Sequence, residues 1–175
     1  MSALGKRMPV EVWTAFSKIE GTITTHHIHV RDELNDRRRS LLIFNEMEVA
    51  QLDNLCAPRL LSGEAWLAKD AILFAVPRKV KGVTSTLVQR SLQSRLGKNE
   101  HRVLIQVPPF RLVGNFHFVG RFQIQDALQR DQADFGLLTH AEVTLLPDPT
   151  VSFATQEVVF AMQHVKMFCA QFEIS

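Results

Sequence analysis

The chain has 175 residues, of which 46% are hydrophobic and 22% are charged, and its formal net charge is +2. This composition supplies enough apolar surface for a packed core and excludes disorder as the main state. No apolar run has the length of a transmembrane helix, and two cysteines are too few for a disulfide scaffold. We therefore predict a cytoplasmic protein with no membrane insertion.

The first part of the chain is predicted to form short β-strands. Apolar and polar side chains roughly alternate from Pro9 to Thr14, and the period of two continues from Ile19 to Ile23. The polar stretch 32–36 has the composition of a turn, and no helix is expected here. The predicted strands cover 9–14, 19–23, 28–30, 41–52, 65–68 and 71–77.

A basic connector follows and is predicted to be helical. Between 78 and 102, seven basic side chains accompany one acidic residue, Glu100. Val88, Leu92 and Leu96 recur at four-residue steps, which indicates the apolar stripe of a helix. Its positive charge could attract nucleic acid or anionic lipid, or it could only keep the connector soluble. The basic residues that we consider for nucleic-acid contact are Arg90, Arg95 and Lys98.

The second half of the chain repeats the plan of the first. Gly21 aligns with Gly114, and one extra residue near Gly120 keeps the apolar positions in phase. The alignment then brings Trp66 onto Phe160. Strands are expected at 102–107, 112–124, 135–146 and 157–172. We predict an internal duplication, with copies over 8–78 and 101–174 and the connector over 79–100.

The order of these signals resembles the Sm-like fold, and five strands in about 70 residues is the size of a small SH3-like barrel. The resemblance is carried by Gly21 in a strand, a polar turn with Asp32 and Asn35, a long strand with Glu48-Val49, and the corner Lys69-Asp70 between apolar strands. The first copy is also similar to uncharacterised bacterial domains with a D-x-L-N core. The resemblance implies an all-β fold of two tandem small SH3-like or Sm-like barrels, association through edge strands into rings, and an RNA pocket.

Three residues of the first copy are candidates for RNA contact. Arg31 and Asn35 could read a base, because Asn offers a donor and an acceptor and Arg offers a stacking plane. The resemblance adds Lys69, which stands where the family has a basic corner residue. A simple turn residue is the other interpretation of Asn35.

Metal and nucleophile chemistry has weaker signals. His27 and His29 would share one face of a strand, and imidazoles are common ligands of transition metals. No Cys-x-x-Cys or His-Glu-x-x-His motif accompanies them, so an exposed polar segment is the alternative. Cys56 could be a nucleophile or an unreactive thiol. Because no phosphate loop or nucleophile elbow is present, we predict a protein that is not an enzyme and has no cofactor.

Two functions remain open from the sequence. The favoured one is a non-enzymatic interaction or scaffold protein that recognises another protein or a small ligand. Self-association is expected as well, because small open barrels leave edge strands that need cover. The alternative is an Sm-like RNA-binding protein, whose affinity would fall sharply with rising salt.

Overall fold

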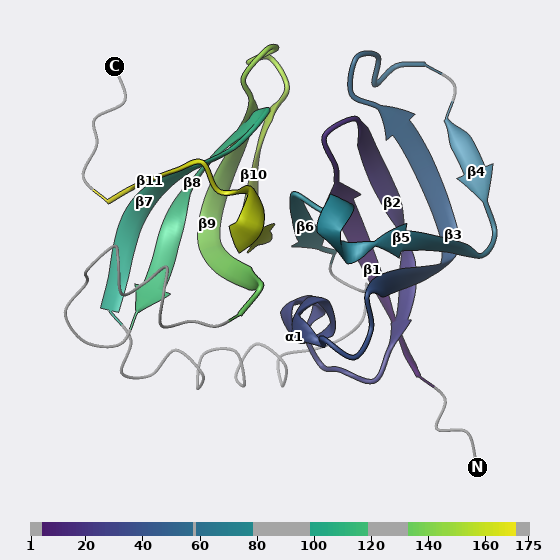
Figure 1. Cartoon of the computed structure of the whole chain (residues 1–175). Coiled ribbons are helices and arrows are strands. Elements are labelled where there is room, and N and C mark those ends of the chain that lie inside the picture. Colours follow the sequence, from purple (N-terminus) through teal and green to yellow (C-terminus); the bar gives the residue numbers. More distant parts are fainter. Residues whose placement is uncertain (1–4, 58, 79–98, 119–132, 171–175) are drawn as a thin grey trace. The chain divides into compact units, whose positions relative to one another are not determined.

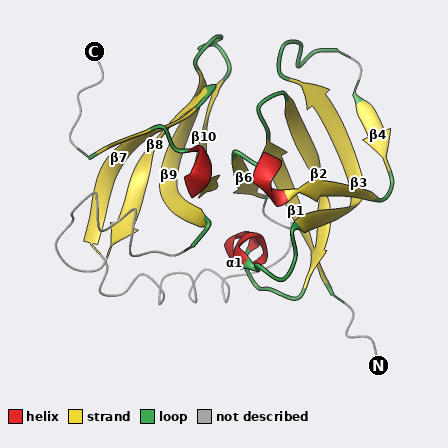
Figure 2. Cartoon of the chain, viewed as in Figure 1, coloured by secondary structure: helices red, strands yellow, loops and turns green. Residues whose placement is uncertain are grey.

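A computed structural model describes residues 5–57, 59–78, 99–118 and 133–170. The described chain is dominated by antiparallel strands and confirms the all-β class (Figure 2). It divides into two compact units. Unit 1 takes the described residues up to 78 together with 133–136 and 158–164, and unit 2 takes the described remainder. Among the described residues, no helix has the length and apolarity to cross a membrane.

The first half of the chain supplies most of unit 1 (Figure 1). Its elements are β1 (Lys6–Trp13), β2 (Ser17–Thr25), α1 (Val30–Asn35), β3 (Leu41–Gln51), β4 (Leu60–Ser62), β5 (Ala65–Ala68), the 3-10 helix η1 (Lys69–Ala71) and β6 (Phe74–Pro77). Antiparallel pairing connects β6 to β1, β1 to β2, β2 to β3, and β3 to both β4 and β5. The last residues of β10 (Ser152–Ala161) also belong to unit 1 and pair with β6.

Unit 2 follows a similar plan of pairing. Its strands are β7 (Asn99–Val107), β8 (Phe110–Phe118), β9 (Phe135–Leu145), whose first two residues belong to unit 1, and β11 (Met167–Cys169). The 3-10 helix η2 (Met162–His164) belongs to unit 1. β7 pairs with β8, β8 pairs with β9, and the closing strand β11 pairs with β7 as β6 does with β1.

The core of each unit comes from the inward positions of its strands. In unit 1, Val10 and Val12 of β1 are buried, and Trp13 stacks on Phe74 with ring centroids 5.7 Å apart. The buried side chains of unit 2 include Val103, Ile105, Leu112, Leu138 and Val143. Successive side chains of a strand point to opposite faces, so Val12 and Trp13 lie on opposite faces of β1, and the end of this strand is buried on both faces.

The strand bounds of the two halves correspond under the single-gap alignment. Ser17 and Thr25, the ends of β2, lie 93 residues before the ends of β8. Leu41 and Gln51, the ends of β3, lie 94 residues before the ends of β9. The alignment therefore matches these strands end to end.

A glycine stands at the same place in both halves, beside a register shift between paired strands. A Cβ on Gly21 would lie 2.3 Å from the Glu46 carbonyl oxygen, and a Cβ on Gly114 would lie 3.1 Å from the Thr139 carbonyl oxygen. The neighbouring strand thus approaches too closely for a side chain at Gly21 and leaves little room at Gly114.

Two local predictions are corrected by the structure. The turn expected at 32–36 is the end of helix α1, and residues 26–29 form a bend in place of a strand. Helix formation is favoured because Val30 and Leu34 bury one face, while Asp32 and Glu33 complement the first helical turn. Of the predicted helical connector, 79–98 lie outside the described residues, and Asn99 and Glu100 begin strand β7.

Candidate functional site

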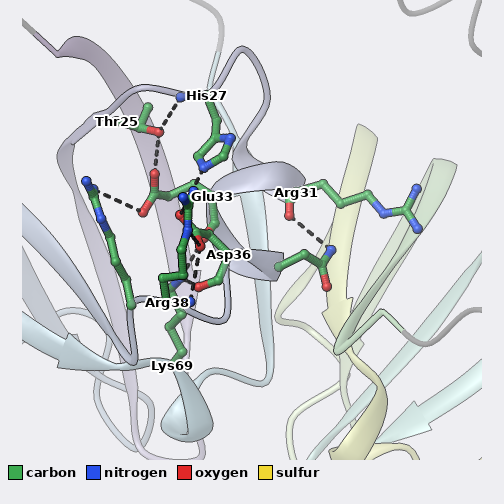
Figure 3. Close-up of polar contacts among 9 residues, drawn as sticks. Thr25, His27, Arg31, Glu33, Asp36, Arg38 and Lys69 are labelled. Atoms are coloured by element: carbon green, nitrogen blue, oxygen red, sulfur yellow. Dashed lines mark hydrogen bonds and ion pairs between the residues drawn. The ribbon is translucent and has the colours of Figure 1, made fainter. Parts of the chain in front are cut away.

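Lys69 caps the carboxyl end of α1 (Figure 3). Its Nζ donates to the carbonyl oxygens of Glu33 at 2.5 Å and of Asp36 at 3.1 Å. The last carbonyls of a helix have no partner within the helix, and the negative end of its dipole favours a cation. The side chain is buried, and this burial lowers the pKa of the Lys69 ammonium. Lys69 is thus used to fix α1 against η1.

Asp36 directly follows α1, and its carboxylate contacts the side chains of Arg38 and His27. Its Oδ1 accepts from Arg38 Nε at 3.0 Å and from the Arg38 backbone N–H at 3.1 Å, and its Oδ2 lies 3.3 Å from His27 Nε2. These hydrogen bonds, from Arg38 first and then His27, hold the pKa of the Asp36 carboxyl well below its usual range. His27 is therefore a partner of a carboxylate in this structure.

The two candidate metal ligands are not brought together with a third. His29 is exposed at the N-cap of α1 and makes no capping hydrogen bond with its side chain. Within the described ranges, no group of three or more His, Cys, Asp or Glu side chains has the arrangement of a metal site. His27 and His29 therefore carry no geometry that favours a metal here.

Glu33 is a buried carboxylate on α1. Its Oε2 accepts a hydrogen bond from the Thr25 hydroxyl, and Arg39 Nη1 lies 3.9 Å from its Oε1. Both Glu33 and Thr25 are buried. A buried carboxylate is tolerated when it is hydrogen-bonded and paired, so this contact ties α1 to the end of β2.

The Asn35 side chain exchanges two hydrogen bonds with the backbone of Phe135, as a residue of a neighbouring strand would. The Phe135 N–H donates to Asn35 Oδ1 at 2.9 Å, and Asn35 Nδ2 donates to the Phe135 carbonyl at 3.1 Å and to the Arg31 carbonyl at 3.0 Å. Arg31 Nε donates to the same Phe135 carbonyl at 3.3 Å. Arg37 adds an exposed two-point ion pair with Asp134, at 2.9 and 3.0 Å. Helix α1 is thereby fixed to 134–135 within unit 1.

The structure thus brings the side chains of the three predicted RNA-contacting residues together at α1. Arg31 and Asn35 lie on α1, and Lys69 lies at its end. Each of the three donates to backbone carbonyls of the protein, a role that sequence reasoning did not identify. The other three predicted residues, Arg90, Arg95 and Lys98, lie outside the described residues.

A second candidate surface is apolar and was missed by sequence reasoning. Leu41 pairs with Ala68, and Ile43 pairs with Trp66, so these four side chains share one face of β3 and β5, which we call the outer face. Leu41 is 43% exposed, Ile43 39% and Trp66 59%. The intervening Leu42 points to the core and is buried. The uninterrupted apolar run at 41–44 is the one sequence signal that both faces of this strand are apolar.

Two of the matching positions of the second half are buried. Phe135 corresponds to Leu41 and is 3% exposed, and Phe160 corresponds to Trp66 and is fully buried. Phe160 pairs with Phe74 of β6, within unit 1. The two matched residues thus differ in exposure. Phe160 lies on a strand that pairs with β6, whereas β5, which carries Trp66, pairs with β3 in the described part of the chain.

Two surfaces of the described residues are therefore candidates for function: the polar cluster around α1, and the outer face of β3 and β5. The polar side chains of the first surface contact other groups of the protein, and the second surface is exposed. Comparisons of the chain with protein-family models, with curated proteins and with solved structures returned no match.

Proposed function

We propose that this chain is a non-enzymatic interaction or scaffold protein that assembles through its edge strands. The observation that carries the proposal is the exposed outer face with Trp66, Leu41 and Ile43. Contiguous exposed apolar surface on a soluble protein marks protein contact sites, and tryptophan is enriched among the residues that dominate binding energy. The outer face therefore suits a protein partner.

The proposal includes an architecture of two similar small SH3-like or Sm-like barrels in tandem, joined by a basic helical connector. The end-to-end correspondence of β2 with β8 and of β3 with β9 supports the duplication. The matching glycines, Gly21 and Gly114, and the register shifts beside them, support it further. When two copies of a domain bury different parts of their surfaces, the copy with the exposed sheet edge can bind a partner there.

The test is the mass of the purified chain by size-exclusion chromatography with light scattering, together with its ultraviolet absorbance ratio before and after nuclease treatment. We expect an assembly free of nucleic acid. It should persist at about 1 M salt, because apolar contacts are not screened as phosphate contacts are.

Either of two results would contradict the proposal. A monomer that captures no protein partner would leave the outer face without a function. An assembly that carries nuclease-sensitive material and dissociates with rising salt would instead support an Sm-like RNA-binding protein. Arg31, Asn35 and Lys69 would then be the first residues to test as RNA contacts.

A further inference from the structure

The outer face of β3 and β5 is apolar at a place where an antiparallel sheet usually carries polar side chains. Trp66 is 59% exposed, and Leu41 and Ile43 are 43% and 39% exposed. The solvent side of such a sheet is normally polar, and a sheet face that is apolar is buried against another element. Because these three side chains are exposed, the described part of the chain does not supply that element.

Glu46 extends the outer face along β3. A register shift brings Phe44 opposite Ile23 and Glu46 opposite Thr22. Thr22 and Ile23 point to opposite faces of β2, and Phe44 is buried in the core, so Glu46 points away from the core. Its exposed carboxylate is therefore on the same side of β3 as Ile43.

Two more carboxylates stand at the ends of β5. Glu64 directly precedes this strand, and Asp70 lies in η1, which directly follows it. Glu46, Glu64 and Asp70 are all exposed, and none of them has an ion pair with another described residue. The three arginines at 37–39, in contrast, are each paired with a carboxylate of the protein. The unpaired charge around the apolar side chains is therefore negative.

The second half of the chain shows a helix at the matching place. Phe135 corresponds to Leu41 and is 3% exposed. Helix α1 is held against it within unit 1, because the Asn35 side chain exchanges two hydrogen bonds with the Phe135 backbone. Arg31 of the same helix donates to the Phe135 carbonyl. A helix that carries an arginine thus lies beside the counterpart of the outer face.

We infer that the outer face binds an amphipathic helix of another protein, one whose apolar stripe is bordered by lysine or arginine. The exposed feature is a set of side chains on a sheet face, which suits the stripe of a helix, whereas an added strand pairs with a backbone edge. Trp66 anchors the apolar contact, and the carboxylates around it attract the cations of the helix. The inference rests on the proposed interaction function and gives the chemistry of the partner.

Two synthetic peptides of equal composition test this inference. One consists of two Leu-Lys-Lys-Leu-Leu-Lys-Leu repeats, which place leucine on one side of a helix, and the other of two Leu-Lys-Leu-Lys-Leu-Lys-Leu repeats, which suit a strand. Both carry fluorescein, and fluorescence anisotropy measures their binding to the full chain. We expect saturable binding of the first peptide, at least about tenfold tighter than that of the second. Equal or tighter binding of the second peptide would overturn the inference.

A pair of aromatic variants locates the binding surface. Trp66→Ser removes the central apolar side chain and should weaken binding of the helical peptide at least about tenfold. Phe16→Ser is the matched control, because Phe16 is 77% exposed and precedes Ser17, which pairs with Gln51 at the other end of β3. Circular dichroism checks that both variants are folded. Equal losses of affinity in the two variants would show general adhesion of the peptide and contradict the inference.

A second set of variants tests the charges. Glu46→Gln combined with Glu64→Gln should weaken binding about three- to tenfold at low salt, with a smaller effect at about 0.5 M salt. Glu142→Gln, at an exposed glutamate of β9, should leave the affinity within about twofold. If the double variant binds as tightly as the Glu142→Gln control, the carboxylates do not select the partner and the inferred chemistry is wrong.

The failure of this inference differs from the failure of the proposed function. If the wild-type chain assembles but does not bind the helical peptide, this inference is wrong and the proposed assembly stands. If Trp66→Ser reduces the mass of an assembly to that of one chain by light scattering, a second copy covers the outer face, and the inference is again wrong. If the wild-type chain is a monomer at all concentrations and binds neither peptide nor protein, both fail.

Discussion

Replacing Asn35 with alanine should destabilise the fold rather than remove a ligand contact. The side chain makes three hydrogen bonds, two with the backbone of Phe135 and one with the Arg31 carbonyl. Each such bond contributes about 0.5–1.5 kcal/mol net, and the Phe135 N–H would lose its partner in a buried setting. We expect Asn35→Ala to lower the free energy of unfolding by about 2–4 kcal/mol.

Urea denaturation followed by tryptophan fluorescence measures this difference, since Trp13 lies in the core of unit 1. Asn54→Ala is the matched control, because Asn54 is an exposed turn residue and its change should cost less than about 0.5 kcal/mol. If Asn35→Ala unfolds like the wild type while losing affinity for RNA, the structural role assigned to Asn35 is wrong and the base-reading hypothesis gains support.

Three further perturbations have defined outcomes. Lys69→Met removes the cation from the end of α1 and should lower the free energy of unfolding by about 1–3 kcal/mol in urea, and an unchanged midpoint would refute the capping role. Gly136→Ala puts a Cβ 2.5 Å from the Phe160 ring and should lower the free energy of unfolding by about 1–3 kcal/mol, as measured by thermal denaturation. In the same experiment Gly63→Ala, whose Cβ meets open space, should be neutral. The lowered pKa of Asp36 means that its ionised form is favoured by folding, so this stability is present at neutral pH and lost as the pH falls below about 4. Asp36→Asn should therefore flatten the acid side of the stability profile measured in urea, and a profile that falls like the wild type would contradict the assignment.

The strands were predictable because their signal is local. Alternation along 9–14 and the long apolar pattern at 41–52 recur in the structure as β1 and β3, within a few residues at each end. The single-gap alignment succeeded in matching β2 with β8 for the same reason, since a period of two fixes which residues face the core. Helix α1 was missed because six residues are too few for a helical period to rise above the turn-forming Asp and Asn.

The candidate site was less accessible from the sequence. Arg31, Asn35 and Lys69 were selected as candidates for RNA contact, and in the structure they donate to backbone carbonyls of Glu33, Asp36 and Phe135. Backbone partners leave no trace in residue types, so the same residues were interpreted as contacts for RNA.

The exposure of Trp66 was also not predictable from the sequence. The alignment matches Trp66 with Phe160, but the structure buries Phe160 and exposes Trp66. Whether a strand position is covered depends on which strand lies beside it. That neighbour is set by tertiary pairing and not by the strand's own sequence.

Hydrogen–deuterium exchange at several protein concentrations tests the central claim most directly, because it reports backbone pairing at the edges themselves. The proposed assembly predicts that amides of 65–68 exchange slowly in concentrated protein and faster on dilution, while amides of β2 keep the same protection throughout. Exchange at 65–68 that is the same at every concentration, in a chain whose mass stays at 19.9 kDa, would contradict it.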